Sequence, residues 1–423
     1  PVLAALTPNR VVPETVFLLV AGMVLGPNVL GVVHADVAIG LLSDLGLGFL
    51  FLLAGYEIDT RELKGEGGRH GLLTWLATFA FALAIAIPVG LWRGNAPGGL
   101  AVAIMLTTTA FGTLIPILKE RGLENTAVGK GVVEYGIWGE LCPVIAMAVL
   151  LGTRAKWITV LLLALFAAVA VASVFVSKWL NRKGSPLARF VKKNSETNSQ
   201  TSVRFVMVLL VGLVALSALF NLDIVLGAFA AGFALRAIIP KGDSSLEHKL
   251  NGIAYGFLVP LFFVASGMKI DPLGVVAEPL LLATFMAGLL LVRAIPIFVS
   301  ASRRKDMQGT DPRVRASIAL YCTTALPLIV AVTSVAMSSG ALSASTGSAL
   351  VAAGGLSVLV MPLLASVALH AIDADLPSAA HKIAQNPRHA IGILKQHHRM
   401  EREKRASSRH VLTKPESGER PPQ

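Results

Sequence analysis

The sequence of 423 residues is 54% hydrophobic and 15% charged, and it carries a formal net charge of +12. An average soluble domain has about 25% charged residues, so this composition excludes an ordinary soluble protein. Apolar stretches of roughly 17–25 residues, each long enough to cross a bilayer as a helix, recur along nearly the whole chain. Because these stretches are continuous rather than alternating, they predict transmembrane helices and not the strands of a barrel.

We expect an all-α polytopic membrane protein with about thirteen transmembrane helices. A partial first span should end near residue 8, and the others should lie at about 12–26, 37–58, 71–92, 99–118, 131–152, 157–177, 205–220, 223–238, 251–268, 276–298, 316–338 and 345–370. These spans belong to one transmembrane domain, residues 1–373. Residues 374–423 are polar and basic, and we expect a flexible tail there.

Lys and Arg are divided unevenly between the two sets of loops that alternating spans create. Thirty-two of the 37 lie in one set together with the tail, four lie in the other set, and Arg293 lies inside a span. The positive-inside rule places the richer set in the cytoplasm. We therefore expect a cell (inner) membrane protein with its N-terminus outside and its C-terminus in the cytoplasm. No folded basic domain suggests a nucleic-acid partner.

Three short strings recur at nearly constant offsets. The matches are Ala21-Gly22 with Ala231-Gly232, Gly55 and Ile58-Asp59 with Gly267 and Ile270-Asp271, and Thr108-Thr109-Ala110 with Thr323-Thr324-Ala325. Each match spans seven expected helices, and because seven is odd, the matched segments cross the membrane in opposite directions. This pattern is typical of inverted-topology repeats, which we place at about 1–152 and 204–370 with a linker helix at 157–177.

The threonine strings lie mid-span, and each has a proline nearby. They comprise Thr107, Thr108 and Thr109 before Pro116, and Thr323 and Thr324 before Pro327. Proline breaks a helix by removing a backbone hydrogen bond, and broken helices offer backbone oxygens and helix ends to an ion. The strings therefore predict two unwound helices around an ion site. The alternative is simple packing, because hydroxyl residues are common between membrane helices.

Three charged residues lie away from the ends of expected spans, where charge is costly and usually functional. Glu140 is interpreted as a shared proton and cation site, and any bound metal is the transported cation at this residue. The alternative is a structural carboxylate paired with a neighbouring helix. Arg293 is either a fixed positive partner of that site or a side chain that extends to the membrane surface. Asp44 either makes a local polar contact or lines an aqueous funnel that leads to the ion site.

These residues and strings resemble the monovalent cation:proton antiporters, specifically the cation:proton antiporter 2 family of bacterial sodium/proton and potassium/proton exchangers. The matching strings are AGMVLGPNVLG, LGLGFLFLLAGYEID, MLTTTAFGTLIPILKERG, IVLGAFAAGFAL, GFLVPLFFVASGMKID and TTALPLIVAV. The resemblance implies a homodimer with a dimerisation domain, and a core domain in which two unwound helices cross. It also implies that the family's ion-binding aspartate falls on Glu140 and its basic core residue on Arg293.

One departure from the family pattern concerns the ion site itself. The family commonly has Asn-Asp, Asp-Asp or Gln-Asp where this chain has Gly139-Glu140. The carboxylate is kept, but the preceding polar side chain is missing, which leaves the choice of ion and the stoichiometry open.

Taken together, these patterns predict secondary antiport of Na⁺ or K⁺ against protons by alternating access, one ion for one proton. No nucleotide-binding or zinc-protease motif appears with its required context, so we expect neither an enzyme nor a cofactor. A cation channel or uniporter, and an organic-anion symporter on a similar fold, remain the alternatives.

Overall fold

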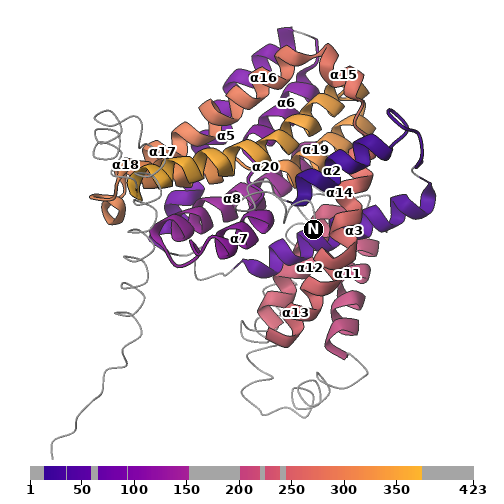
Figure 1. Cartoon of the computed structure of the whole chain (residues 1–423), viewed down its shortest axis with the longest axis horizontal. Coiled ribbons are helices and arrows are strands. Elements are labelled where there is room, and N and C mark those ends of the chain that lie inside the picture. The colour runs from indigo at the N-terminus through magenta and orange to yellow at the C-terminus, as the bar shows by residue number, and fades with distance from the viewer. Residues whose placement is uncertain are drawn as a thin grey trace, which may run out of the picture. The chain divides into compact units, whose positions relative to one another are not determined.

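The computed structural model describes residues 14–34, 36–58, 65–92, 94–151, 201–219, 224–238 and 244–373. Within these ranges the chain is helical and contains no strand (Figure 1). Residues up to Ser366 form one compact unit, and a second unit begins at Val367. The expected partial first span, the linker helix at 157–177 and the tail at 374–423 lie outside the described residues.

The helices follow the expected spans to within a few residues. They are α2 (Glu14–Leu25), α3 (Val37–Glu57), α5 (Glu66–Trp92), α6 (Ala96–Leu106), α7 (Phe111–Glu120), α8 (Ala127–Leu150), α11 (Thr201–Leu219), α12 (Ile224–Ile238), α13 (Ser244–Ile253), α14 (Val259–Met268), α15 (Pro272–Ala277), α16 (Pro279–Gly288), α17 (Ile295–Arg303), α18 (Pro312–Tyr321), α19 (Leu326–Ser338) and α20 (Ala344–Asp373). Three short turns join them: η2 (Ala254–Leu258) and η3 (Leu289–Ala294), which are π-helical, and η4 (Lys305–Met307), which is a 3₁₀ turn.

Eight of the helical segments in the described ranges are long and apolar enough to cross a membrane. They are Val37–Glu57, Glu66–Leu91, Ala96–Ile115, Ala127–Leu150, Leu246–Met268, Pro279–Arg303, Pro312–Ser338 and Ala344–Leu369. Two shorter apolar helices, Glu14–Leu25 and Ile224–Arg236, lie where the sequence also predicts short spans. The expectation of an all-helical, multi-spanning membrane protein is therefore confirmed, while the expected count of about thirteen includes spans outside the described residues.

Helix packing divides the first unit into two groups. In the first helix group, α2, α3, α11, α12, α13, η2 and α14 pack against one another. In the second helix group, α5, α6, α7, α8, α16, η3, α17, α18 and α19 do so, and α20 joins them through hydrogen bonds to α18 and to the start of α19. Figure 1 shows α11, α12 and α13 together, away from α5, α16 and α17.

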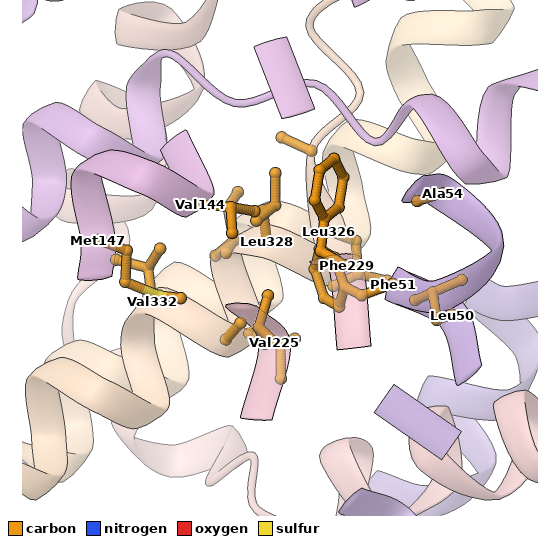
Figure 2. Packing of buried hydrophobic residues seen from close by; sticks show 14 of the residues in the cluster. Leu50, Phe51, Ala54, Val144, Met147, Val225, Phe229, Leu326, Leu328 and Val332 are labelled. Atoms are coloured by element: carbon orange, nitrogen blue, oxygen red, sulfur yellow. The ribbon is translucent and has the colours of Figure 1, made fainter. Parts of the chain in front are cut away.

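The two groups meet along an apolar seam. Figure 2 shows side chains of α3 and α12 close to side chains of α8 and α19. The first helix group contributes Leu50, Phe51, Ala54, Val225 and Phe229, and the second contributes Val144, Met147, Leu326, Leu328 and Val332. All ten are buried. The seam therefore joins the groups by close packing of apolar side chains, the main source of helix association inside a membrane.

Glycines bring α3 and α12 into backbone contact. A Cβ atom built on Gly55 would lie 2.3 Å from the carbonyl oxygen of Phe229, and one built on Gly232 would lie 1.9 Å from that of Leu52. No real side chain tolerates such distances. Each helix therefore presents a glycine to the backbone of the other, as expected where small residues allow close helix approach in membranes.

Helices α2 and α14 make the same kind of contact. A Cβ on Gly22 would lie 2.0 Å from the carbonyl oxygen of Val264, and a Cβ on Gly267 would lie 2.1 Å from that of Leu19. These two glycines are the ones that the recurring strings match to Gly232 and Gly55. Each helix contact thus joins a glycine from one half of the sequence to a glycine from the other half.

Replacing Gly232 with alanine should destabilise the protein by about 1–3 kcal/mol, because the new methyl group must displace the backbone of α3. The measurement is thermal unfolding of the purified protein in detergent. The matched control is Gly212→Ala in α11, where a Cβ would meet nothing within 4 Å and alanine favours the helix. Equal melting temperatures for the two variants would contradict the packing described for α3 and α12.

Candidate functional site

Two interrupted helices cross within the second helix group. The first interruption is Thr107–Ala110, between α6 and α7, and the second is Cys322–Ala325, between α18 and α19. The hydroxyl of Thr109 donates to the carbonyl of Cys322 at 2.5 Å, and the N–H of Ala110 donates to the carbonyl of Thr324 at 2.5 Å. The unwound segments therefore satisfy one another's backbone groups, which lipid cannot do.

Threonine hydroxyls explain how each helix ends inside an apolar environment. Thr107 and Thr108 donate to the carbonyls of Ile104 and Met105, at 2.8 and 2.7 Å, and Thr323 donates to that of Leu320 at 2.6 Å. These hydroxyls give the last carbonyls of α6 and α18 a second donor, beside the backbone N–H of the same threonine that tightens each helix end. All five threonines that the sequence singles out are fully buried, and the hydroxyl of Thr324 has no partner among the described residues.

Glu140 lies beside this crossing, on α8. Its side chain is only 4% exposed, so it faces neither lipid nor open water. The N–H of Gly112, in the first turn of α7, donates to its Oε2 atom at 3.1 Å. The carbonyl of Gly139, the preceding residue, accepts from the N–H of Thr109 at 2.8 Å. Glu140 is thus held against the start of α7, where the helix dipole favours a negative charge.

A tyrosine from the first helix group completes the surroundings of Gly112. Pro116 has no N–H, so the carbonyl of Gly112 has no donor four residues along α7. The hydroxyl of Tyr255, in the π-helical turn η2, donates to this carbonyl at 3.3 Å. The sequence analysis missed Tyr255, although the carbonyl freed by Pro116 is a signal that some donor must lie nearby.

Arg293 is fully buried but does not pair with Glu140. Its Nη2 atom donates to the hydroxyl of Thr109 at 2.9 Å and to the carbonyl of Tyr135 at 3.2 Å, and it forms no ion pair with a carboxylate among the described residues. It lies in the π-helical turn η3. The structure therefore brings Arg293 to the crossing, but to its threonine and backbone oxygens rather than to the carboxylate.

The missing side chain at position 139 makes room for this arginine. A Cβ atom on Gly139 would lie 2.1 Å from Arg293 Nη2 and 2.4 Å from Thr109 Oγ1. Any side chain at this position would have to displace the guanidinium or the unwound segment. Where the family commonly has a polar side chain before the carboxylate, this chain has Gly139, and the guanidinium of Arg293 occupies the space that such a side chain would need.

A cavity of about 940 Å³ approaches the site from one end of the helices. Its charged lining consists of five glutamates, Glu57, Glu66, Glu124, Glu134 and Glu247, and three basic residues, Lys119, Lys130 and Arg236. Phe111, which precedes the residue that holds Glu140, also lines it. The excess of carboxylates gives the cavity a negative character that attracts cations. Asp44 is exposed and does not line this cavity.

Glu134, six residues before Glu140 on α8, takes part in a separate ion-pair network. Arg304 donates to the carboxylate of Glu134 and also forms two hydrogen bonds to Asp306, at 3.0 and 2.6 Å. The hydrogen bonds from Arg304 hold the pKa of Asp306 below its usual value. The network ties α8 to the segment after α17 through Glu134, which also lines the cavity.

The described residues contain no group of three or more His, Cys, Asp or Glu side chains that could hold a metal ion. The site thus offers a cation one carboxylate and the oxygen atoms of the unwound segments. This donor set fits a weakly held, exchangeable hard cation better than a resident transition metal.

Comparisons with known proteins agree with this geometry. The family model described as "Sodium/hydrogen exchanger, transmembrane" matches residues 2–370. The Bacillus cereus protein named Na(+)/H(+)-K(+) antiporter GerN is 24% identical over 357 residues, which cover 83% of this chain and 88% of that protein. The Bacillus subtilis protein YjbQ is 25% identical over 374 residues, and this chain spans 58% of its length.

Among solved structures, the sodium proton antiporter MjNhaP1 from Methanocaldococcus jannaschii has a similar fold. Its TM-score is 0.59 at 16% identity, with 88% of this chain and 94% of that chain covered. The family match, over residues 2–370, extends over nearly all of the described helices. The resemblance seen in the sequence is confirmed: this chain belongs to the sodium/hydrogen exchanger family.

Proposed function

We propose that this protein exchanges a monovalent cation, Na⁺ or K⁺, against protons across a membrane, with Glu140 as the site that both share. The observation that carries this proposal is a single buried carboxylate beside two crossed, unwound helices. No basic side chain among the described residues forms an ion pair with Glu140. Its charge in this apolar setting therefore needs either a proton or a cation.

Competition for one carboxylate is sufficient for coupled exchange. A proton and a hard cation cannot occupy the same carboxylate together, so the binding of one releases the other. If only the occupied site can change the side of the membrane that it faces, each turnover exchanges one ion for the other. The five threonines lie in the two unwound segments beside the site, and the Thr324 hydroxyl, which has no partner among the described residues, is available as an additional ligand.

The acidic cavity supports a route for the cation. Its lining residues lie in the loops and helix ends that the distribution of Lys and Arg places in the cytoplasm, and it extends to Phe111. We infer that the structure represents a state open to the cytoplasm, with the N-terminus outside and the C-terminus inside. Glu140 is reached from this cavity only past Phe111 and the first turn of α7.

The two helix groups support alternating access by relative movement. We assign the second helix group to the core domain and the first to the dimerisation domain of a homodimer in the cell membrane. The apolar seam between them (Figure 2) lets the groups shift without breaking many polar contacts. The glycine contacts of α2 with α14 and of α3 with α12 support two inverted repeats. The glycines of one contact are matched in the recurring strings to the glycines of the other, with the two halves of the sequence interchanged.

The names of the relatives support both Na⁺ and K⁺ as substrates, since GerN is named for both ions. The name of GerN and the family match of this chain favour cation/proton exchange over a cation channel, a uniporter or an organic-anion symporter. Asp44 is left as a surface residue in this proposal, because it is exposed and lies outside the acidic cavity.

Replacing Glu140 with glutamine should reduce cation-dependent proton movement to background. Glutamine keeps an oxygen to accept from the Gly112 N–H but cannot hold or release the proton. The measurement is the recovery of a pH-sensitive dye in proteoliposomes after addition of Na⁺, Li⁺ or K⁺. The control is Asp311→Asn, which makes the same chemical change at an exposed residue that caps α18 and should keep full activity. A fully active Glu140→Gln variant would remove the proposed site.

Transport should be electroneutral, with one cation for one proton, because the site contains one titratable carboxylate and residue 139 contributes none. A cycle that moved one net charge would shift its equilibrium about fiftyfold per 100 mV, since that charge is worth about 2.3 kcal/mol. The measurement is the equilibrium pH gradient that Na⁺ sets, with and without a membrane potential imposed without any K⁺ gradient. A shift of that size would show that a second charge moves.

Gly139→Ala should lower stability by about 1–3 kcal/mol, the usual cost of overpacking, and should reduce the rate of exchange. The added methyl group must displace Arg293 or Thr109, both of which hold the crossing. Combining it with Arg293→Lys, which removes the forked end of the side chain, should restore part of the stability. The measurement is thermal unfolding of the single and double variants, and the absence of any rescue would count against the contact between residue 139 and the guanidinium.

A further inference from the structure

A second cavity, of about 500 Å³, lies at one end of α5 and α17 and shares only Glu66 with the lining of the acidic cavity. It is lined by Glu66, Arg69, His70, Leu73, Arg303, Arg304, Lys305 and Asp306. Both helices are candidate membrane spans, so the cavity lies at the depth where a membrane helix emerges from the hydrocarbon.

The charged side chains that line this cavity have a net positive charge, even when the ion pair between Arg304 and Asp306 is not counted. Arg304 and Asp306 neutralise each other through two hydrogen bonds, at 3.0 and 2.6 Å. This leaves Arg69, Arg303 and Lys305 against Glu66. All three basic residues are exposed, and none forms an ion pair within the described residues. The cavity is thus suited to an anion, and two arginines suit a phosphate in particular, since a guanidinium can donate two parallel hydrogen bonds to it.

An apolar stripe leads away from the cavity along each helix. On α5, Leu73 and Leu76 follow Arg69 at spacings of four and three residues, which places all three on one face. On α17, Ile295 and Val299 precede Arg303 at spacings of four residues.

The four apolar side chains of these stripes are exposed, Leu73 and Ile295 by half or more. Each stripe therefore leads from an arginine at the cavity into the apolar part of its candidate membrane span.

The two helices are held side by side where the stripes run. The hydroxyl of Thr74 on α5 donates to Ser300 Oγ on α17 at 2.6 Å, and Ser300 also shares a hydrogen bond of 3.1 Å with the hydroxyl of Tyr135. Arg304 is buried and tied to α8 through Glu134. The positions of Arg69 and Arg303 are therefore set by a fixed pair of helices and not by a loose loop.

We propose that this cavity binds the phosphate of an anionic membrane phospholipid, whose acyl chains lie along the two apolar stripes. The basic residues recognise the phosphate, which a soluble phosphate ester would share. The stripes favour the lipid, because they are exposed to hydrocarbon and only a lipid carries apolar chains beside its phosphate. Basic pockets between membrane helices on the cytoplasmic side are suited to such headgroups.

The test is native mass spectrometry of the purified, delipidated chain titrated with dioleoylphosphatidylglycerol, dioleoylphosphatidylcholine or glycerol 3-phosphate. Phosphatidylglycerol should bind more tightly than phosphatidylcholine. The Arg69→Gln/Arg303→Gln variant should weaken its binding about thirtyfold, which corresponds to about 1 kcal/mol for each basic residue. The matched control, Arg204→Gln/Lys269→Gln, removes two exposed charges outside both cavities and should leave binding unchanged.

A further variant tests the acyl chains separately. Leu76→Ser/Val299→Ser changes no residue that lines the basic cavity, and it should weaken the binding of dioleoylphosphatidylglycerol but not that of a short-chain phosphatidylglycerol. Equal losses in the arginine variant and the matched control would overturn the proposal in favour of diffuse attraction. Equal binding of phosphatidylcholine, or competition by glycerol 3-phosphate as strong as that of phosphatidylglycerol, would also overturn it. None of these readouts depends on ion exchange.

Discussion

The rest of the structure depends on keeping one carboxylate away from both lipid and bulk water. Such a group is costly in an apolar interior, and the surrounding helices lower that cost without neutralising it. Backbone N–H donation at the start of α7 holds Glu140, and the buried guanidinium of Arg293 donates to Thr109 and Tyr135 instead. Breaking two helices supplies this arrangement, because it places helix ends and backbone oxygens where an unbroken helix would present only apolar side chains.

Much of this could be predicted from the sequence, for physical reasons. A helix that crosses a membrane needs about twenty apolar residues, so the spans can be recognised in the sequence. The predicted ends of most spans lie within a few residues of the observed helix ends. A charged residue inside a span is rare enough that Glu140 and Arg293 stand out. The threonine strings next to proline likewise indicate breaks, and the structure places them at the crossing.

What could not be predicted are the partners of these residues. Arg293 has a side chain long enough to reach either Glu140 or the threonines, and only the helix geometry together with the space at Gly139 decides between them. Tyr255 lies far from Gly112 in the sequence, and nothing in its local pattern marks it as a donor. Asp44 looked like a possible funnel residue because it lies within a span, but the sequence cannot tell which side of a helix faces the cavity.

The two π-helical turns have a consequence for how this fold tolerates insertions. A π turn holds one residue more than the α-helix around it, and one residue corresponds to a rotation of about 100°. Removing one residue from Leu289–Ala294 would therefore leave a regular α-helix, in which Ser300 and Arg304 keep their contacts with Thr74 and Glu134. The change would fall on the turn itself, where Arg293 would rotate away from Thr109 at the crossing.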